Sequence, residues 1–167
     1  LGGPHKNLPG IFKAFAILKR NNIDFRLHLV LPDRKQMDEL AREFDVADKL
    51  IYYPEVPQEK LADLMRQADA LVLYSQYETF GCVVIEANAT GIPAILSDLP
   101  VFREYGIEKK TCLFATVNQP DRLASVLLDF INRKQDFNKK EIAEITAKRF
   151  SMEVVGKQFN DFYDSLF

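Results

Sequence analysis

The chain has 167 residues, of which 47% are hydrophobic and 28% are charged, and its formal net charge at pH 7 is -2. This length and composition are typical of one globular domain. The balanced charge gives no electrostatic support for a nucleic-acid partner, and no apolar run is long enough to predict a membrane span. The two cysteines, Cys82 and Cys112, are too few for a disulfide framework and lack metal-site spacing, so a reducing cytosol is the simplest compartment.

Short apolar runs alternate along the chain with longer segments of helical periodicity. In chain order, the patterns predict a helix at 8–19, a strand at 25–31, a helix at 35–44, a strand at 50–53, a helix at 58–67, a strand at 70–74, a helix at 80–89, strands at 92–96 and 112–115, a helix at 121–132, and two helices in 139–167 that meet near Phe150 and Ser151. Strands that alternate with helices favour βαβ units. We therefore predict one α/β domain over residues 1–167, with a Rossmann-like parallel sheet and helices on both faces.

Ligands of such sheets bind beyond the carboxyl ends of the strands. The loops to consider are therefore 32–33, 54–57, 75–79 and 97–103. Residues 2–7 join them if a strand precedes Leu1, because these residues resemble a loop between a strand and a helix. Since the chain begins with Leu rather than Met, we expect it to be a fragment of a larger protein.

The segment 75–87 directly follows the most apolar predicted strand. Thr79 is a suitable cap for the helix that follows, and Gly81 would let another group approach the backbone closely. The N–H groups of residues 80–83 would then be unpaired donors at the start of the helix. Such donors, together with the helix dipole, favour an anion such as a phosphate.

Two carboxylates flank this turn, with seven residues between Glu78 and Glu86. Glu86 stands among apolar residues, and a buried carboxylate needs partners. A ligand diol would supply two hydroxyl donors; a nearby Lys or Arg, or a solvated edge, is the alternative. Glu78 alone would be an ordinary solvated loop residue, and only its spacing from Glu86 makes it a candidate.

Residues 78–87, Glu-Thr-Phe-Gly-Cys-Val-Val-Ile-Glu-Ala, resemble the paired-glutamate motif of the family-4 retaining glycosyltransferases, which have the two-domain GT-B architecture. The resemblance covers most of residues 5–130. It implies that the chain is the carboxyl-terminal, nucleotide-sugar-binding domain of such an enzyme. The first strand and an amino-terminal acceptor domain would then lie outside the chain, and the isolated domain would not turn over.

The resemblance also implies roles for single residues. In catalysis, Glu78 would bind hydroxyls of the donor sugar, and Lys6 would neutralise the diphosphate leaving group. Glu86 would bind the ribose hydroxyls of the nucleotide. The other donor-binding groups would be the amides of Phe80 and Gly81 at the sugar, the amides of Cys82 and Val83 at the phosphate, and the loop of Pro54, Glu55 and Val56 at the base.

The reaction that the resemblance implies is transfer of a hexose from a UDP- or GDP-sugar to an acceptor, with retention and without a metal. A mannosyl or a glucosyl donor fits, and the acceptor, a glycan, a lipid or a small molecule, stays open. The enzyme would be cytoplasmic, with membrane association through the amino-terminal domain left open. The family's arginine before Lys6 would fall at Leu1 or earlier. The last helix of such a protein can cross to the other domain, which would expose some of its aromatic residues.

Other interpretations of the same residues remain. A flavodoxin-like regulatory or protein-binding module has the same alternation of strands and helices but gives the two glutamates no role. Lys6 is also a plausible solvated lysine. For Cys82 we expect a buried packing role rather than a reactive thiol, and Asp98 fits simple turn chemistry.

Overall fold

The computed structural model describes residues 4–30 and 34–166. Leu1, Leu31 and the loop 32–33, which carry predictions made above, lie outside these residues. The strands are β1 (Leu27–Val30), β2 (Leu50–Tyr53), β3 (Leu71–Leu73), β4 (Ala94–Ser97) and β5 (Cys112–Ala115). The α-helices are α1 (Leu8–Arg20), α2 (Lys35–Glu43), α3 (Gln58–Gln67), α4 (Cys82–Ala89), α5 (Pro100–Arg103), α6 (Pro120–Arg133), α7 (Lys139–Phe150) and α8 (Met152–Asp164).

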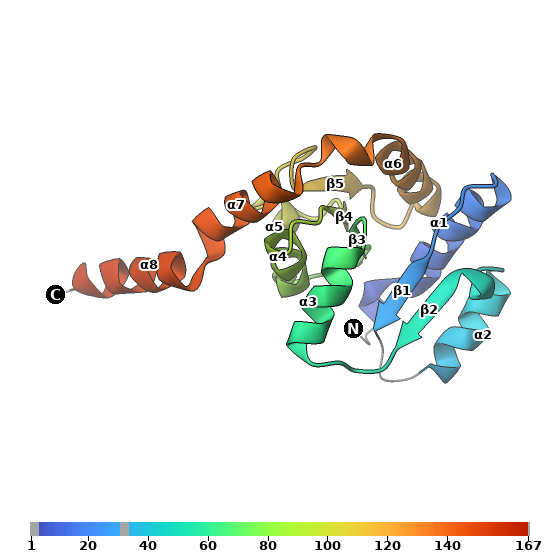
Figure 1. The fold of residues 1–167 in the computed structure, drawn as a ribbon, viewed down its shortest axis with the longest axis horizontal. Helices are drawn as coiled ribbons and strands as arrows, with labels where there is room; N and C mark the ends of the chain where they lie inside the picture. The colour runs from blue at the N-terminus through green and yellow to red at the C-terminus, as the bar shows by residue number, and fades with distance from the viewer. Residues whose placement is uncertain (1–3, 31–33, 167) are drawn as a thin grey trace.

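All described strand pairs are parallel, which confirms the predicted α/β architecture (Figure 1). β1 pairs with β2, and Leu27 lies opposite Leu50. β3, β4 and β5 form a second sheet, in which Leu71, Ala94 and Cys112 stand side by side. The sequence predicted one continuous sheet, but among the described residues no hydrogen-bonded ladder joins β1 to β3.

One face of the sheets is covered by α1 and α6, which pack against each other (Figure 1). Asn7 starts α1, because its side chain accepts a hydrogen bond from the Gly10 N–H. From α1, Phe12 and Phe15 enter the main apolar core, and Leu127 enters it from α6. Burial of each such side chain stabilises the folded state by about 1.5–3 kcal/mol. The packing of α1 and α6 therefore contributes much of the stability on the side of the sheets opposite α3 and α4.

The other face is covered by α3, α4 and α5, and α7 packs on α4. α4 is apolar nearly all round because it lies between the sheet and α7. Its Val84 packs with Phe102 and Cys112, and its Ala87 packs with Met65 of α3. Burial raises the pKa of the Cys112 thiol to about 12, so this cysteine is an inert packing residue.

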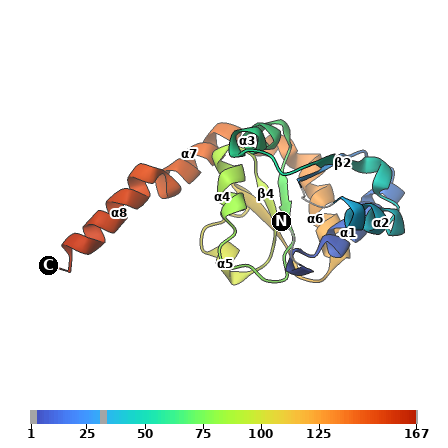
Figure 2. The ribbon, with the colours of Figure 1, turned by 90° about the horizontal axis from the view of Figure 1, so that it is seen from below.

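α7 and α8 meet at Ser151, which confirms the predicted break. Ser151 ends α7 and caps α8, since its hydroxyl accepts from the Val154 N–H. α8 projects away from the body in both views (Figures 1 and 2), and it has no buried residue. Exposed apolar side chains on and just after α8 are Met152, Phe159, Phe162, Tyr163 and Leu166. None of the described helices is long and apolar enough to cross a bilayer.

Several boundaries differ from the prediction: the strand predicted at 25–31 begins at Leu27, the strand predicted at 70–74 is Leu71–Leu73, and two further differences have a physical reason in the contacts. The strand predicted at 92–96 is shifted to Ala94–Ser97, because the Ile92 N–H closes the end of α4 by donating to the Ala87 carbonyl. The helix predicted at 80–89 begins only at Cys82, since Gly81 adopts a left-handed conformation with φ of 79°. The short helix α5 was expected as a loop; Pro100 at its first position favours it.

Asn88 tests how α4 is fixed to the sheet. Its buried side-chain amide donates to the carbonyls of Ile92, at 2.9 Å, and Thr111, at 3.1 Å. Asn88→Ala removes both bonds and leaves the Thr111 carbonyl with only its bond from the Ala94 N–H, so the free energy of unfolding in urea should fall by about 1–3 kcal/mol. The matched control is Asn160→Ala on exposed α8, which should change stability by less than about 0.5 kcal/mol. Equal effects of the two variants would contradict this role of Asn88.

Candidate functional site

Four loops meet beyond the carboxyl ends of β3, β4 and β5, where the parallel sheet predicts a ligand site. The short 3-10 helix at Pro4–Lys6 is tied to the loop after β3, since the Gln76 N–H donates to the His5 carbonyl at 2.7 Å. The Gln76 side chain donates in turn to Asn118, in the loop after β5, at 2.9 Å. These bonds place the amino-terminal loop next to the segment that carries the paired glutamates.

Lys6 and Glu78 form the central ion pair of this edge. The Lys6 Nζ lies 2.5 Å from the Glu78 Oε2, and their side chains are 16% and 11% exposed. The Ser75 hydroxyl lies 3.5 Å from the same carboxylate oxygen. Seventy-two positions separate the two charges in the chain, so their pairing is a consequence of the fold and not of local sequence. Partial burial makes this pair less screened by water than the surface pairs of the chain.

Buried hydroxyl groups fix the loops around this pair. The Ser97 hydroxyl donates to the Ser75 carbonyl at 2.5 Å, and both residues are fully buried. The Tyr74 hydroxyl donates to the Thr116 carbonyl at 2.5 Å and accepts from the Gln119 N–H at 2.8 Å. Burial raises the pKa of Tyr74, which keeps this hydroxyl protonated. The ends of β3, β4 and β5 are thereby locked together.

Gly81 stands at the N-cap position of α4, and no side chain caps this helix. The prediction that Thr79 caps it is therefore wrong, because the helix starts two residues later than that role needs. The N–H groups of Gly81, Cys82 and Val83 donate to no backbone carbonyl within the described part of the chain. These unpaired donors at a helix start form an electropositive cradle.

Phe80 precedes this cradle and is held by a residue that the sequence did not single out. The Tyr105 hydroxyl donates to the Phe80 carbonyl at 2.8 Å. The Phe80 and Tyr105 rings pack with centroids 5.5 Å apart, and the Phe80 side chain stays exposed. A contact to a carbonyl 25 positions away leaves no periodic signal in the sequence, which is why Tyr105 escaped prediction.

Glu86 lies one turn into α4 and lines a groove of about 270 Å³ between α3 and α4. The groove has an apolar floor that includes Leu61, Met65 and Ala89. Within the described residues, the Glu86 carboxylate has no hydrogen-bond or ion-pair partner, although Arg66 lines the same groove and pairs with Asp63. The alternative that Glu86 is neutralised by a nearby cation is therefore wrong. Its half-buried carboxylate is left with unused acceptor capacity.

The other predicted residues are spread around this groove and edge. Pro54 and Glu55 are exposed and Val56 is half-buried in the loop that leads into α3, whose first residue lines the groove. Cys82 is exposed, so the expected buried packing role is wrong; as the first residue of α4 it faces away from the core. Asp98 forms a two-pronged ion pair with Arg103 at 2.7 and 3.0 Å, which lowers the pKa of its carboxyl group.

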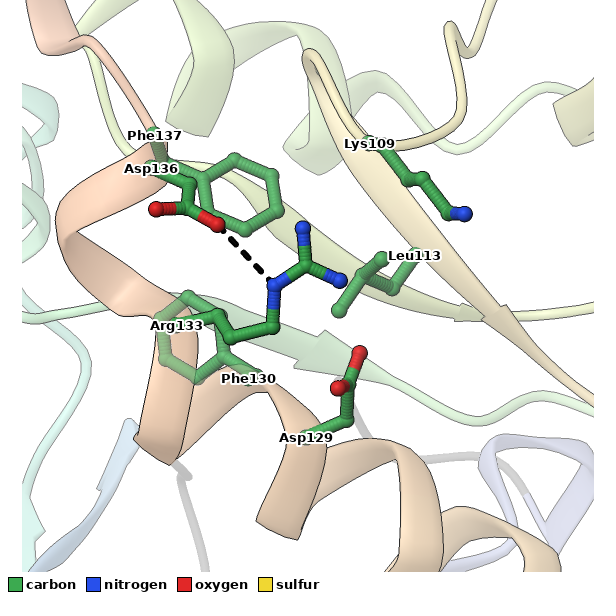
Figure 3. A pocket seen from close by; sticks show the side chains of 7 residues that line it. All are labelled: Lys109, Leu113, Asp129, Phe130, Arg133, Asp136 and Phe137. Carbon is green, nitrogen blue, oxygen red and sulfur yellow. Dashed lines mark hydrogen bonds and ion pairs between the residues drawn. The ribbon is translucent and has the colours of Figure 1, made fainter.

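A second hollow lies beyond the amino end of β5, away from these groups (Figure 3). Its volume is about 10 Å³, enough for about one water molecule. Arg133 and Asp136 form an ion pair across it, at 2.9 Å, beside the rings of Phe130 and Phe137. Since Arg133 and Asp136 pair with each other and little space remains, this hollow is a small packing void and not a ligand site.

The fold and this edge define the class of protein. Parallel strands, a cradle of free amides, the Lys6–Glu78 ion pair and the unpaired Glu86 carboxylate define an α/β domain with its polar groups near the carboxyl edge of the sheet. Residues 2–149 match the model of the glycosyl transferases group 1 family, and the chain belongs to this family. The match favours the glycosyltransferase interpretation over a flavodoxin-like module.

The chain also resembles individual proteins of known sequence or structure. It is 27% identical over 136 residues to an uncharacterized glycosyltransferase, YqgM, of Bacillus subtilis, with 79% of this chain and 37% of that protein covered. Sucrose-phosphate synthase from Thermosynechococcus elongatus superposes with a TM-score of 0.87 at 24% identity, over 99% of this chain and 43% of that one. The structure of Anabaena HepE in complex with UDP superposes with a TM-score of 0.84 at 18% identity, over 98% of this chain and 46% of that one. The chain thus spans less than half the length of each.

Gly81 tests the shape of the cradle. A Cβ at this position would lie 2.7 Å from the Phe102 ring, and φ of 79° is unfavourable for any other residue type. Gly81→Ala should therefore lower the free energy of unfolding by about 2–4 kcal/mol. In contrast, Gly156→Ala in α8, where a Cβ meets only open space, should raise stability by about 0.5–1 kcal/mol. Thermal or urea unfolding measures both, and a neutral Gly81→Ala would contradict the left-handed cap.

Proposed function

We propose that this chain is the donor-binding domain of a retaining glycosyltransferase, which transfers a hexose from a nucleotide diphosphate sugar to an acceptor. The observation that carries the proposal is the unpartnered, half-buried Glu86 carboxylate beside a groove and one turn from a cradle of free amides. A ribose diol fits this carboxylate, because two hydroxyl donors satisfy it without a charge. Each hydrogen bond to a carboxylate contributes about 1.5–3 kcal/mol.

We assign the other donor-binding groups from their positions near the start of α4 and beside the groove. The amides of Cys82 and Val83 would bind the phosphate groups, and those of Phe80 and Gly81 would meet the sugar. Glu78, whose side chain is 11% exposed, would accept bonds from sugar hydroxyls. The loop of residues 54–56 would face the base, since it leads into Gln58 at the head of the groove.

Lys6 would neutralise the diphosphate as it departs. In the free protein its charge is held by Glu78, so both side chains are placed before a donor arrives. A diphosphate would share the ammonium with Glu78, and the free amides would stabilise the negative charge that builds on the leaving oxygen. A lysine and a helix start supply this positive charge without a metal ion, which is why we propose a metal-independent reaction. Retention at the anomeric carbon is part of the same proposal.

The donor would be a UDP- or GDP-linked hexose, with mannose and glucose both fitting. Support for a nucleoside diphosphate comes from the Anabaena neighbour, whose structure holds UDP in the same fold. No side chain described here distinguishes the two bases by its chemistry alone. Titration with both nucleotides decides between them.

We further propose that residues 1–167 form one domain of a two-domain enzyme, and that the acceptor binds the amino-terminal domain. The unpaired facing edges of β1 and β3 suit one more parallel strand preceding α1, as the right-handed crossover rule requires. The exposed apolar residues of α8 suit a surface that the other domain covers. On this proposal the isolated domain binds the donor but does not transfer the sugar.

The first test is calorimetric titration of the protein with UDP, GDP and ADP, first without metal and then with magnesium. Binding of one nucleotide in both conditions is the expected result. Glu86→Ala should lower the affinity for that nucleotide about 10- to 100-fold, because one or more hydrogen bonds to a carboxylate are lost. Glu59→Ala, an exposed change on α3, is the control and should leave affinity unchanged. Equal affinities of wild type and Glu86→Ala would refute the ribose role.

Glu78→Ala separates the sugar from the nucleotide. The free nucleoside diphosphate should bind as well as in wild type or more tightly, because Lys6 loses its competing carboxylate. The corresponding sugar nucleotide should bind about tenfold more weakly, since its hydroxyls lose an acceptor. Titration of both ligands against both proteins measures the difference. Equal losses for the two ligands would contradict the sugar role of Glu78.

A further inference from the structure

Tyr105 follows α5 and is buried beneath the loop that carries Phe80 and Gly81. Its hydroxyl donates to the Phe80 carbonyl at 2.8 Å, and it would lie 3.2 Å from a Cβ placed on Gly81. The Phe102 ring packs edge-on against Tyr105, with centroids 6.2 Å apart. Tyr105 therefore supports this loop from the side of the core.

The carbonyl that Tyr105 holds and the Gly81 N–H belong to one peptide unit. In a planar trans peptide these two groups point in opposite directions. A carbonyl anchored toward the core therefore aims the Gly81 N–H outward, and this N–H donates to no backbone carbonyl in the described chain. Glycine adopts left- and right-handed conformations with similar ease, so little else prevents the peptide from rotating.

We infer that Tyr105 is a positioning residue, which holds the Phe80–Gly81 peptide so that the Gly81 N–H faces the donor sugar. This role rests on the proposed function, because it assigns the sugar to that N–H. Tyr105 itself does not touch the donor. Because the peptide is already oriented, the donor does not pay the conformational entropy of ordering it on binding.

The hydroxyl of Tyr105 remains a donor under ordinary conditions. Burial, and then the nearby Glu78 carboxylate, raise the pKa of Tyr105. A protonated phenol has one hydrogen to donate, and the Phe80 carbonyl receives it. The bond to the loop is therefore present throughout the neutral pH range.

The end of α7 holds Tyr105 in place. Arg149 donates through Nη1 to the Tyr105 carbonyl at 2.9 Å and through Nη2 to the Glu104 carbonyl at 3.2 Å. The next residue, Phe150, packs edge-on against both Tyr105 and Phe80, with centroids 6.0 and 6.4 Å apart. The corner where α8 begins thus reaches the Phe80–Gly81 peptide through Tyr105, and it also contacts the Phe80 ring directly through Phe150.

Selective labelling reads out this peptide without any ligand. The Phe-Gly dipeptide occurs once in the sequence, so carbonyl-13C phenylalanine with 15N glycine gives one carbonyl-correlated amide peak from these residues, that of Gly81. Tyr105→Phe keeps the ring and removes the hydroxyl, and it should move or broaden this peak. Tyr53→Phe, which removes a hydroxyl bonded to His28 instead, should leave the peak in place. An unchanged peak in Tyr105→Phe would overturn the inference.

Affinity measurements on the full polypeptide then separate positioning from folding. Tyr105→Phe should lower the affinity for UDP-glucose about fivefold, or for GDP-mannose if GDP is the nucleotide bound. The affinity for the matching free nucleotide should fall less than about twofold, since only the sugar uses the Gly81 N–H. A merely structural defect would weaken both ligands alike, and that result would overturn the inference. Wild-type protein that binds neither nucleotide refutes the proposed function and the sugar role with it, whereas the labelled peak still reports on Tyr105.

Arg149→Lys tests the second link. Lysine cannot reach both carbonyls with a planar fork, so the Gly81 peak should move in the same direction as in Tyr105→Phe. Because both residues act on one peptide, the double variant should lose less affinity for the sugar nucleotide than the two single losses combined. Strictly additive losses would show that Arg149 does not act through Tyr105.

Discussion

Parallel pairing of β3, β4 and β5 is the constraint on which the candidate site depends. It brings the carboxyl ends of the three strands to one edge, and the loops with a proposed role leave this edge or are tied to it, except for the loop 54–56, which follows β2. A parallel arrangement alone would leave these loops free to move. Buried hydroxyls prevent this: Ser97 holds Ser75, and Tyr74 holds the loop after β5. These buried hydroxyls therefore hold neighbouring loops together by hydrogen bonds, and we assign them no contact with a bound ligand.

The two motif glutamates have opposite electrostatic situations. Glu78 is nearly buried and already neutralised by Lys6, so its cost of desolvation is met within the protein. Glu86 is half-buried without a partner in the described chain, so its acceptor capacity remains for a ligand. The first arrangement holds a lysine at the position proposed for the diphosphate, and the second leaves an acceptor for the proposed ribose hydroxyls. One motif thus supplies a preformed charge pair and an open acceptor, with seven residues between the two glutamates.

Periodic apolar patterns in the sequence predicted the helices and strands, whereas contacts between residues far apart in the chain were missed. Alternating apolar runs predicted all five strands, and the break at Ser151 was placed correctly, because each depends on neighbours along the chain. The cap of α4 was misplaced, since Gly81 takes a conformation that competes with capping by Thr79. Cys82 was expected to pack because free cysteines are commonly buried, but as the first residue of α4 it is exposed, whereas Val84 two residues later is buried. Pairing of Lys6 with Glu78 was not predicted at all; only the tertiary structure brings them together.

The support for the proposed donor groups lies almost wholly within this chain. The cradle at Gly81 rests on Phe102 and Tyr105, the ion pair rests on Ser75, and the groove at Glu86 is closed by α3. None of these contacts uses α8 or the facing edges of β1 and β3, which are the surfaces left without partners in the described residues. The proposed donor site and these surfaces are therefore physically separate. Only the corner at Arg149 and Phe150 joins them, because α8 starts there and Tyr105 is held there.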